Sequence, residues 1–173
     1  MSYVHLYCGD GKGKTTAALG LGLRCCGSGG RVLLAQFLKG SGSSELNAIE
    51  KLEGFDVLPG PAQVKFTFQM TEEERREAAG FWLSFFRRAV SQAVEGGYRL
   101  LILDALAGAV SLGMVPEEEA AAFLKNRPEE LEVAVTGRDP SPALLAEAGY
   151  VSEIRAVRHP YEQGVSARRG IEY

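Results

Sequence analysis

The chain has 173 residues, a length at which one domain can bury a core without a disulfide or metal staple. Its 19 lysines and arginines against 22 acidic residues give a net charge of −3, which excludes the broad basic surface typical of nucleic-acid binding. The three cysteines fit no C-x-x-C or zinc-ligand spacing, the start MSYVHLYC has no signal-peptide pattern, and no apolar stretch reaches the ~20 residues of a membrane span. We therefore expect a reduced, cytoplasmic protein without membrane or nucleic-acid partners.

The first part of the chain alternates between strand and helix patterns. Residues 3–8 form a short apolar run that ends at a glycine cluster, which predicts a buried strand entering a turn. A helix is expected from Lys14 to the glycines at 27, 29 and 30, followed by a strand at 31–37. A short helix around 45–52 and a strand at 55–58 come next, and residues 59–69 read as irregular.

The second part opens with the capping box Thr71-Glu-Glu-Glu74, which starts a long helix that Gly96 and Gly97 end. Apolar residues recur along it at three- and four-residue spacing and are predicted to face the core: Ala78, Phe81, Trp82, Phe85, Phe86, Ala89, Val90 and Ala93. Residues 99–104 (RLLILD) are typical of a central parallel strand with a carboxylate at its end. Further strands are expected at 131–136 and 151–157, with helices at 117–125 and 142–148.

This order of elements predicts one α/β domain over residues 1–173, with a tail from about residue 158 whose arginine-rich end, 166–173, we expect to be mobile. Right-handed crossovers place the strands in a parallel sheet with helices on both faces. Ligands of such sheets bind at the carboxyl ends of the strands.

The stretch CGDGKGKT, residues 8–15, lies between the first strand and the first helix. Glycines there let backbone N–H groups converge on phosphate, while Lys14 supplies a charge and Thr15 a hydroxyl for Mg²⁺. The common phosphate-loop pattern has glycine where this chain has Cys8, a departure that Gly9 and Lys12 compensate. Chance clustering of glycines is the alternative interpretation.

The motifs GDGKGKTTAA, QFLKG, FTF, LLILDA and TGR and the ending HPYEQGVSARRGIEY occur in this order over nearly the whole chain. In this combination the chain resembles the P-loop type of ATP:corrinoid (cob(I)alamin) adenosyltransferases. The resemblance implies a RecA-like P-loop NTPase fold, a three-layer sandwich with a mainly parallel sheet. It also implies a cob(I)yrinic acid a,c-diamide adenosyltransferase, which transfers the 5′-deoxyadenosyl group of ATP to Co(I) of a corrinoid and releases triphosphate in adenosylcobalamin biosynthesis or salvage.

By resemblance, the loop and its surroundings hold ATP with Mg²⁺. Lys14, Thr15 and Asp104 are expected to act in catalysis, with Thr15 and Asp104 as metal ligands and Asp104 at the end of the strand beside the loop. Arg24 is expected near the nucleoside, and Arg138 near the phosphates or ribose. The full set expected to bind the nucleotide is Gly9, Asp10, Gly11, Lys12, Gly13, Lys14, Thr15, Thr16, Arg24, Gln36, Lys39 and Arg138.

The corrinoid is the second substrate, and Phe66 and Phe68 match aromatics that cover the lower face of the corrin in the family. Without an axial ligand, Co(II) is far easier to reduce to Co(I). His159, Gly164 and Arg168 match positions near the corrinoid or a subunit contact. The resemblance further implies a homodimer and a separate electron-donating flavoprotein reductase, since the chain has no cysteine pair or flavin motif. A purely structural role stays open for the aromatic pair, the arginines, Gln36, Lys39 and the tail.

Residue 105 is alanine, whereas many members of the family carry a glutamate there. Three hypotheses follow. The chain is an active adenosyltransferase, a weakened module that binds ATP or corrinoid, or an ordinary RecA-like ATPase. The third lacks support from the sequence because no glutamate or glutamine is evidently placed to activate water.

Overall fold

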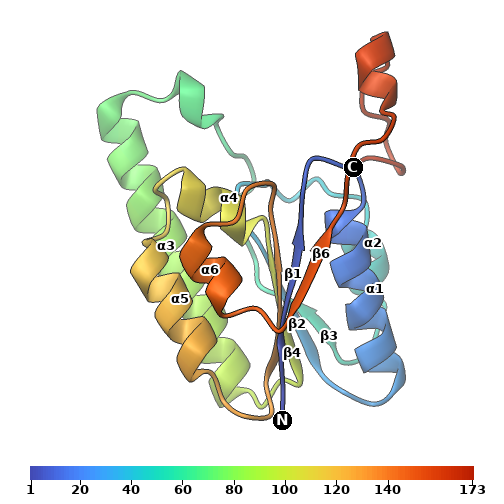
Figure 1. Ribbon diagram of the computed structural model, residues 1–173, viewed down its shortest axis with the longest axis vertical. Helices are drawn as coiled ribbons and strands as arrows, with labels where there is room; N and C mark the ends of the chain where they lie inside the picture. The colour runs from blue at the N-terminus through green and yellow to red at the C-terminus, as the bar shows by residue number, and fades with distance from the viewer.

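The computed structural model, which describes residues 1–173, has six parallel strands in one sheet, in the order β3-β2-β4-β5-β1-β6 (Figure 1). The strands are β1 Val4–Cys8, β2 Val32–Gln36, β3 Phe55–Val57, β4 Leu100–Asp104, β5 Glu132–Thr136 and β6 Tyr150–Glu153. Strands β2 and β4 are buried along their whole length, as expected of central strands covered on both faces. The α/β class with a parallel sheet is confirmed.

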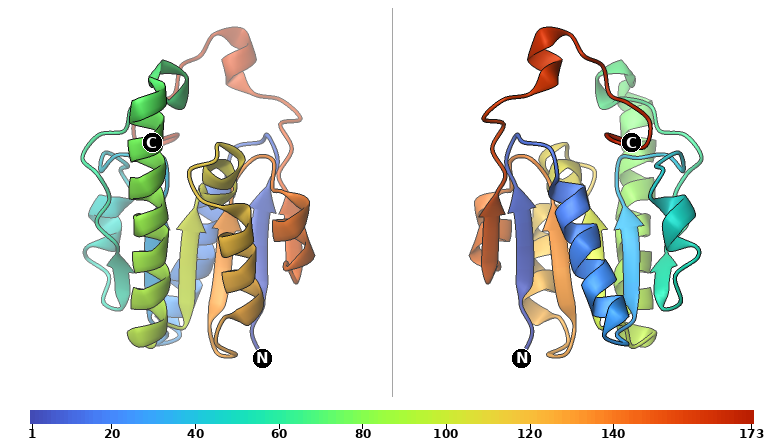
Figure 2. Two further views of the ribbon diagram at one scale, coloured as in Figure 1. Left: turned by 90° about the vertical axis from the view of Figure 1, so that its left-hand side faces the viewer. Right: turned by 90° about the vertical axis from the view of Figure 1, so that its right-hand side faces the viewer.

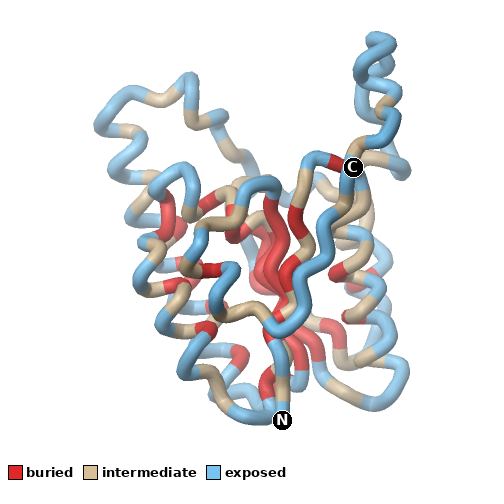
Figure 3. Tube along the Cα trace, in the orientation of Figure 1, coloured by how far each residue is buried: buried red, intermediate tan, exposed pale blue.

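Helices cover both faces of the sheet, so the molecule has three layers (Figure 2). Helices α1 (Lys14–Gly27) and α2 (Leu46–Ile49) lie on one face. The other face carries α3 (Glu72–Glu95), α4 (Leu106–Ser111), α5 (Glu117–Asn126) and α6 (Pro142–Ala146). Two hydrophobic clusters, of 26 and 8 buried residues, fill the space between the helices and the two faces, and the buried segments follow the middle of the sheet (Figure 3).

Helix α3 begins as its sequence predicts. The Thr71 hydroxyl accepts from the Glu74 N–H at 3.2 Å, and the Glu74 carboxylate accepts from the Thr71 N–H at 2.7 Å. Trp82, Phe85 and Phe86 are buried on the core side, whereas Phe81 keeps 40% of its surface exposed. The predicted apolar stripe is therefore wider than the face that the sheet covers.

Strand β5 pairs with both β1 and β4 and separates them, yet Asp104 at the end of β4 lies beside the phosphate loop, because its carboxylate accepts from the Thr15 hydroxyl at 2.8 Å. Two expectations from the sequence need correction. The stretch after Asp104 forms helix α4, for which no helix was predicted. Strand β6 ends at Glu153 rather than at residue 157, because its only partner, β1, ends at Cys8, which pairs with Glu153.

Two irregular segments of the chain lie at the carboxyl edge of the sheet. The loop with the 3₁₀ turn η1 (Thr67–Gln69) and the tail with the 3₁₀ turn η2 (Pro160–Gln163) project beyond this edge (Figure 1). The last residues of the tail fold back toward the start of α1. Every helix falls short of the length or the hydropathy that crossing a bilayer requires.

Candidate functional site

The phosphate loop joins β1 to α1 and is held at two points by its own backbone. Gly9 and Gly13 have φ angles of 97° and 119°, in the left-handed region that favours glycine. The Gly9 N–H donates to the Arg138 carbonyl at 3.0 Å, and the Gly11 N–H donates to the Ile154 carbonyl at 2.7 Å. The ends of β5 and β6 thus fix the path of the loop.

Asp10 adds a third attachment from its side chain. Its carboxylate accepts a hydrogen bond from the Ala156 N–H at 2.9 Å. This bond is the main reason why the pKa of Asp10 lies below its usual value. Asp10 therefore fastens the loop to the segment that leads into the tail.

A cavity of about 210 Å³ lies inside the loop, at the N-terminus of α1. Its lining residues are Asp10, Gly11, Lys12, Gly13, Lys14, Thr15, Thr16, Arg138, His159, Ile171 and Glu172. The Lys14 ammonium points back into the loop and donates to the Gly11 carbonyl at 2.7 Å. Burial, followed by the nearby Arg138 charge, lowers the pKa of Lys14. An anion bound in this cavity would act against both effects, because its negative charge favours the charged form of Lys14.

Asp104 is the centre of a second group of polar residues next to this cavity. Its side chain is fully buried, and both carboxylate oxygens accept hydrogen bonds. Oδ1 accepts from the Thr15 hydroxyl at 2.8 Å and from the Thr136 hydroxyl at 2.7 Å. Oδ2 accepts from the Lys39 ammonium at 2.6 Å and from the Gln36 amide at 3.3 Å. Four donors, from α1, β2, β5 and the loop after β2, compensate the buried charge.

Sequence reasoning expected Thr136 near the phosphates or ribose, as part of the TGR motif, but did not predict its contact with Asp104, and it missed Glu45. The Thr136 hydroxyl, besides donating to Asp104, accepts the Ala105 N–H at 2.8 Å. Glu45 accepts from the Gln36 amide at 2.9 Å and reaches the same region from the start of α2. The threonine at the end of a strand and the acid in a serine-rich loop carry no local signal for these contacts.

The contacts of Gln36 and Glu45 bear on the inference that no residue is placed to activate water for ATP hydrolysis. The sequence indicated no glutamate or glutamine placed to activate water, yet Gln36 contacts Asp104, and Glu45 contacts Gln36. They are hydrogen-bonded to each other, so neither is free in this arrangement.

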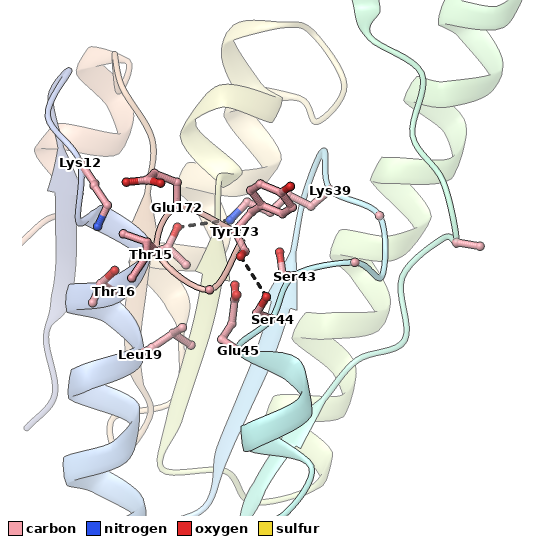
Figure 4. Close-up of a pocket in the computed structure, with 15 residues that line it drawn as sticks. Lys12, Thr15, Thr16, Leu19, Lys39, Ser43, Ser44, Glu45, Glu172 and Tyr173 are labelled. Carbon is pink, nitrogen blue, oxygen red and sulfur yellow. Dashed lines mark hydrogen bonds between the residues drawn. The ribbon is translucent and has the colours of Figure 1, made fainter. Parts of the chain in front are cut away.

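A larger cavity of about 990 Å³ opens next to the phosphate loop (Figure 4). Lys12, Thr15, Thr16 and Leu19 line it from the loop and α1, and Lys39 to Glu45 supply most of a second wall. The last four residues of the chain close part of it, and the Tyr173 carbonyl accepts from the Ser44 hydroxyl at 2.9 Å. The tail is thus docked on the site.

Glu172 is the acidic side chain of the docked tail. Arg168, four residues earlier, donates to its carboxylate at 3.0 Å, and this pairing is the main cause that lowers the pKa of Glu172 to about 2. The positive charge of Lys12 acts in the same direction, more weakly. A carboxylate therefore faces the loop where an anionic ligand is expected.

The structure does not bring every predicted residue to these cavities. Arg24 lies in the last turn of α1, about 15 Å along the helix from Lys14, and lines neither cavity. Phe66 and Phe68 stack on each other with ring centroids 5.5 Å apart and are 67% and 80% exposed. They lie on the projecting η1 loop, outside both cavities.

Ala105, which replaces an expected glutamate, has a left-handed φ of 61°. Such a backbone is strained for a residue other than glycine and persists only where its surroundings hold it. Here the hydrogen bond from its N–H to Thr136 supplies part of that hold. The residue packs against the larger hydrophobic cluster.

The donor set at Asp104 fits Mg²⁺ better than a transition metal. Thr15 and Asp104 offer a hydroxyl and a carboxylate, and no group of three or more histidine, cysteine, aspartate or glutamate side chains could hold a metal by itself. Mg²⁺ is usually bound through one or two protein oxygens together with substrate phosphates and water. The phosphate cavity beside Thr15 leaves space for such phosphates.

Comparison with known proteins gives a consistent result. Residues 1–173 match the family described as ATP:corrinoid adenosyltransferase BtuR/CobO/CobP. The corrinoid adenosyltransferase of Escherichia coli (strain K12) is 32% identical over 97% of this chain and 84% of the relative. Corrinoid adenosyltransferase CobA of Salmonella typhimurium is 33% identical over the same shares of the two chains, and the enzyme of Pseudomonas aeruginosa is 28% identical over 97% and 82%.

Proposed function

Since the chain belongs to the ATP:corrinoid adenosyltransferase family, we propose that the carboxyl edge of its sheet holds ATP by the triphosphate and turns the 5′ carbon of the ribose toward the cobalt of a corrinoid. The protein is a corrinoid adenosyltransferase, and ATP and the corrinoid are its substrates. The observation that carries the proposal is the phosphate loop with Lys14 and the Asp104 group beside it, at the edge of the larger cavity.

The reaction requires a nucleophile, a leaving group and a fixed geometry between them. Co(I) of the substrate attacks C5′, the bond between C5′ and the phosphate oxygen breaks, and triphosphate leaves with the electron pair. The protein therefore has to orient C5′ and stabilise charge on the departing oxygens. Lys12, Lys14 and the backbone N–H groups at the start of α1 are suited to the second task.

Mg²⁺ would be held by Thr15 and Asp104 together with phosphate oxygens, where it would neutralise charge on the leaving triphosphate. Thr136 would keep the Asp104 carboxylate oriented toward Thr15. Lys39, just after β2, would contact a phosphate of the nucleotide, and Gln36, at the end of β2, would contact the nucleotide or its metal.

The remaining roles follow the family resemblance and the placement of the residues. We propose that Phe66 and Phe68 cover one face of the corrin, and their exposure and stacking are compatible with such a contact. Arg138 would contact phosphate, since it lines the loop cavity. For Arg24 only the resemblance supports a role near the nucleoside. His159 and Arg168 would contribute through the docked tail.

The wider setting is proposed on similar grounds. The protein acts as one domain, as a homodimer in the cytoplasm, where its three free cysteines stay reduced. A separate flavoprotein reductase delivers the electron that converts Co(II) to Co(I), because the chain offers no redox group of its own.

The leaving group tests the proposal. The protein is incubated with Mg²⁺, ATP and chemically reduced corrinoid, and the products are separated by chromatography. We expect adenosylcorrinoid and triphosphate in equal amounts, and we expect Asp104→Asn to suppress both. Orthophosphate without adenosylcorrinoid would instead identify an ATPase that uses Gln36 or Glu45. Tight binding without turnover, with turnover restored by Ala105→Glu, would identify a weakened binding module.

A further inference from the structure

The ammonium of Lys39 lies between the two oxygens that suit a metal ion. Its Nζ is 2.6 Å from Asp104 Oδ2 and 3.3 Å from Thr15 Oγ1, and the second contact is drawn in Figure 4. Asp104 is fully buried, while the Lys39 side chain keeps 33% of its surface exposed. A cation that is part of the protein thus compensates the buried carboxylate.

The backbone before Lys39 supports this placement. Leu38 has a left-handed φ of 58°, a conformation that is strained for a residue with a Cβ and persists only where its surroundings hold it. The preceding N–H, of Phe37, donates to the Asp104 carbonyl at 2.9 Å. The chain therefore leaves β2 beside Asp104 and then turns sharply, and this turn directs Lys39 to the carboxylate.

An ammonium and Mg²⁺ cannot occupy this position together. Mg²⁺ lies about 2.0–2.1 Å from its oxygen ligands, so a metal bound to Thr15 and Asp104 would stand within contact distance of the Lys39 nitrogen. Two cations at that separation repel each other strongly in a buried setting. Metal binding therefore requires Lys39 to move.

We propose that Lys39 occupies the metal position of the nucleotide-free protein, so that Mg²⁺ enters only together with the triphosphate, which receives the displaced ammonium. This inference rests on the proposed metal role of Thr15 and Asp104. Lys39 lines the larger cavity, and its flexible stem can carry the ammonium from Asp104 to a phosphate oxygen. In this way Lys39 prevents free metal from binding to Thr15 and Asp104 before the nucleotide does.

Binding of Mn²⁺ without nucleotide, followed by electron paramagnetic resonance, tests the proposal. We expect Lys39→Met to bind Mn²⁺ at least about tenfold more tightly than the wild type, because a charged competitor at the carboxylate is gone. Lys39→Arg keeps the charge and is the matched control, expected to bind Mn²⁺ as weakly as the wild type. Adding Asp104→Asn to Lys39→Met should remove the gain. Equal affinities of the wild type and Lys39→Met would overturn the proposal.

Two further measurements separate this inference from the proposed function. Mn²⁺ should bind more tightly to wild-type protein with ATP than to ATP alone, and if it does not, the metal role of Thr15 and Asp104 fails whatever Lys39 does. If Lys39→Met does not fold, Lys39→Gln retains a donor for Asp104 without the charge, and the same gain is expected. For the wild type, Mg²⁺ alone should leave the unfolding temperature unchanged, and an increase with Mg²⁺ alone would contradict the inference.

Discussion

Replacing Thr136 with valine tests whether one hydroxyl fixes the Asp104 group. The Thr136 side chain is 2% exposed, donates to Asp104 Oδ1 at 2.7 Å and accepts from the Ala105 N–H at 2.8 Å. Valine has nearly the same shape, so the change removes two hydrogen bonds without opening a cavity. The Ala105 N–H is left without its acceptor, and the carboxylate keeps three of its four donors.

The expected cost follows from these two losses. A hydrogen bond to a charged group contributes about 1.5–3 kcal/mol, and a buried amide left unpaired costs about 1–3 kcal/mol. Since relaxation recovers part of the sum, we expect Thr136→Val to lower the free energy of unfolding by about 2–4 kcal/mol. With a denaturant slope of about 2 kcal/mol per molar urea, the unfolding midpoint falls by about 1–2 M.

Urea unfolding followed by circular dichroism measures this difference. Thr136→Ser is the matched control, because it keeps the hydroxyl and loses only a methyl group, at a cost of about 1 kcal/mol. In an Asp104→Asn background the effect of Thr136→Val should shrink, since the charged partner is absent. If the valine variant were as stable as the serine variant, the hydroxyl would contribute nothing and the reasoning would be refuted.

Three other predictions follow from the loop and the tail. Lys14→Met should weaken ATP binding about tenfold to a hundredfold in equilibrium dialysis, because charge-assisted bonds to phosphate are lost, while the exposed Lys125→Met should bind as the wild type does. Gly11→Ala places a Cβ 2.8 Å from a backbone carbonyl and should destabilise the protein by more than ~1 kcal/mol. Gly20→Ala, on an open helix surface, should instead stabilise it by about 0.5–1 kcal/mol. Urea unfolding measures both variants, and equal effects would contradict the close contact at Gly11. The pKa of Glu172 is lowered from 4.5 to about 2, mainly by its hydrogen bonds with Arg168, so the turn that these two residues form in the tail is favoured above pH 4.5 and loses this contribution as the pH falls toward 2; a carboxyl carbon shift that titrates near 4.5 would show that this pairing is absent.

Much of the local structure could be predicted because its causes are local. The apolar runs that become β2 and β4 need burial on both faces, and the capping box at Thr71 satisfies the first N–H groups of α3 by itself. The phosphate loop is specified in the same way, since the φ angles of Gly9 and Gly13 are accessible to glycine at little cost. The positions of Lys14 and Thr15 at the start of α1 follow from that loop.

The arrangement of the site depends on contacts between distant segments, which no local pattern specifies. Sequence order does not say that β5 inserts between β1 and β4, yet this insertion makes Thr136 the partner of Asp104. Likewise, Lys39 was expected at the nucleotide, but only the fold shows its contact with Asp104, and Glu45 reads as a loop acid until the fold brings it to Gln36.

The sequence by itself therefore determined the parallel α/β architecture and the phosphate loop, because periodicity and glycine conformations act over a few residues. Only the tertiary structure decided which side chains compensate the buried carboxylate and where the tail docks. The physical reason is that a buried charge must find its donors wherever the packed strands present them, and strand order is set by the packing of the whole chain.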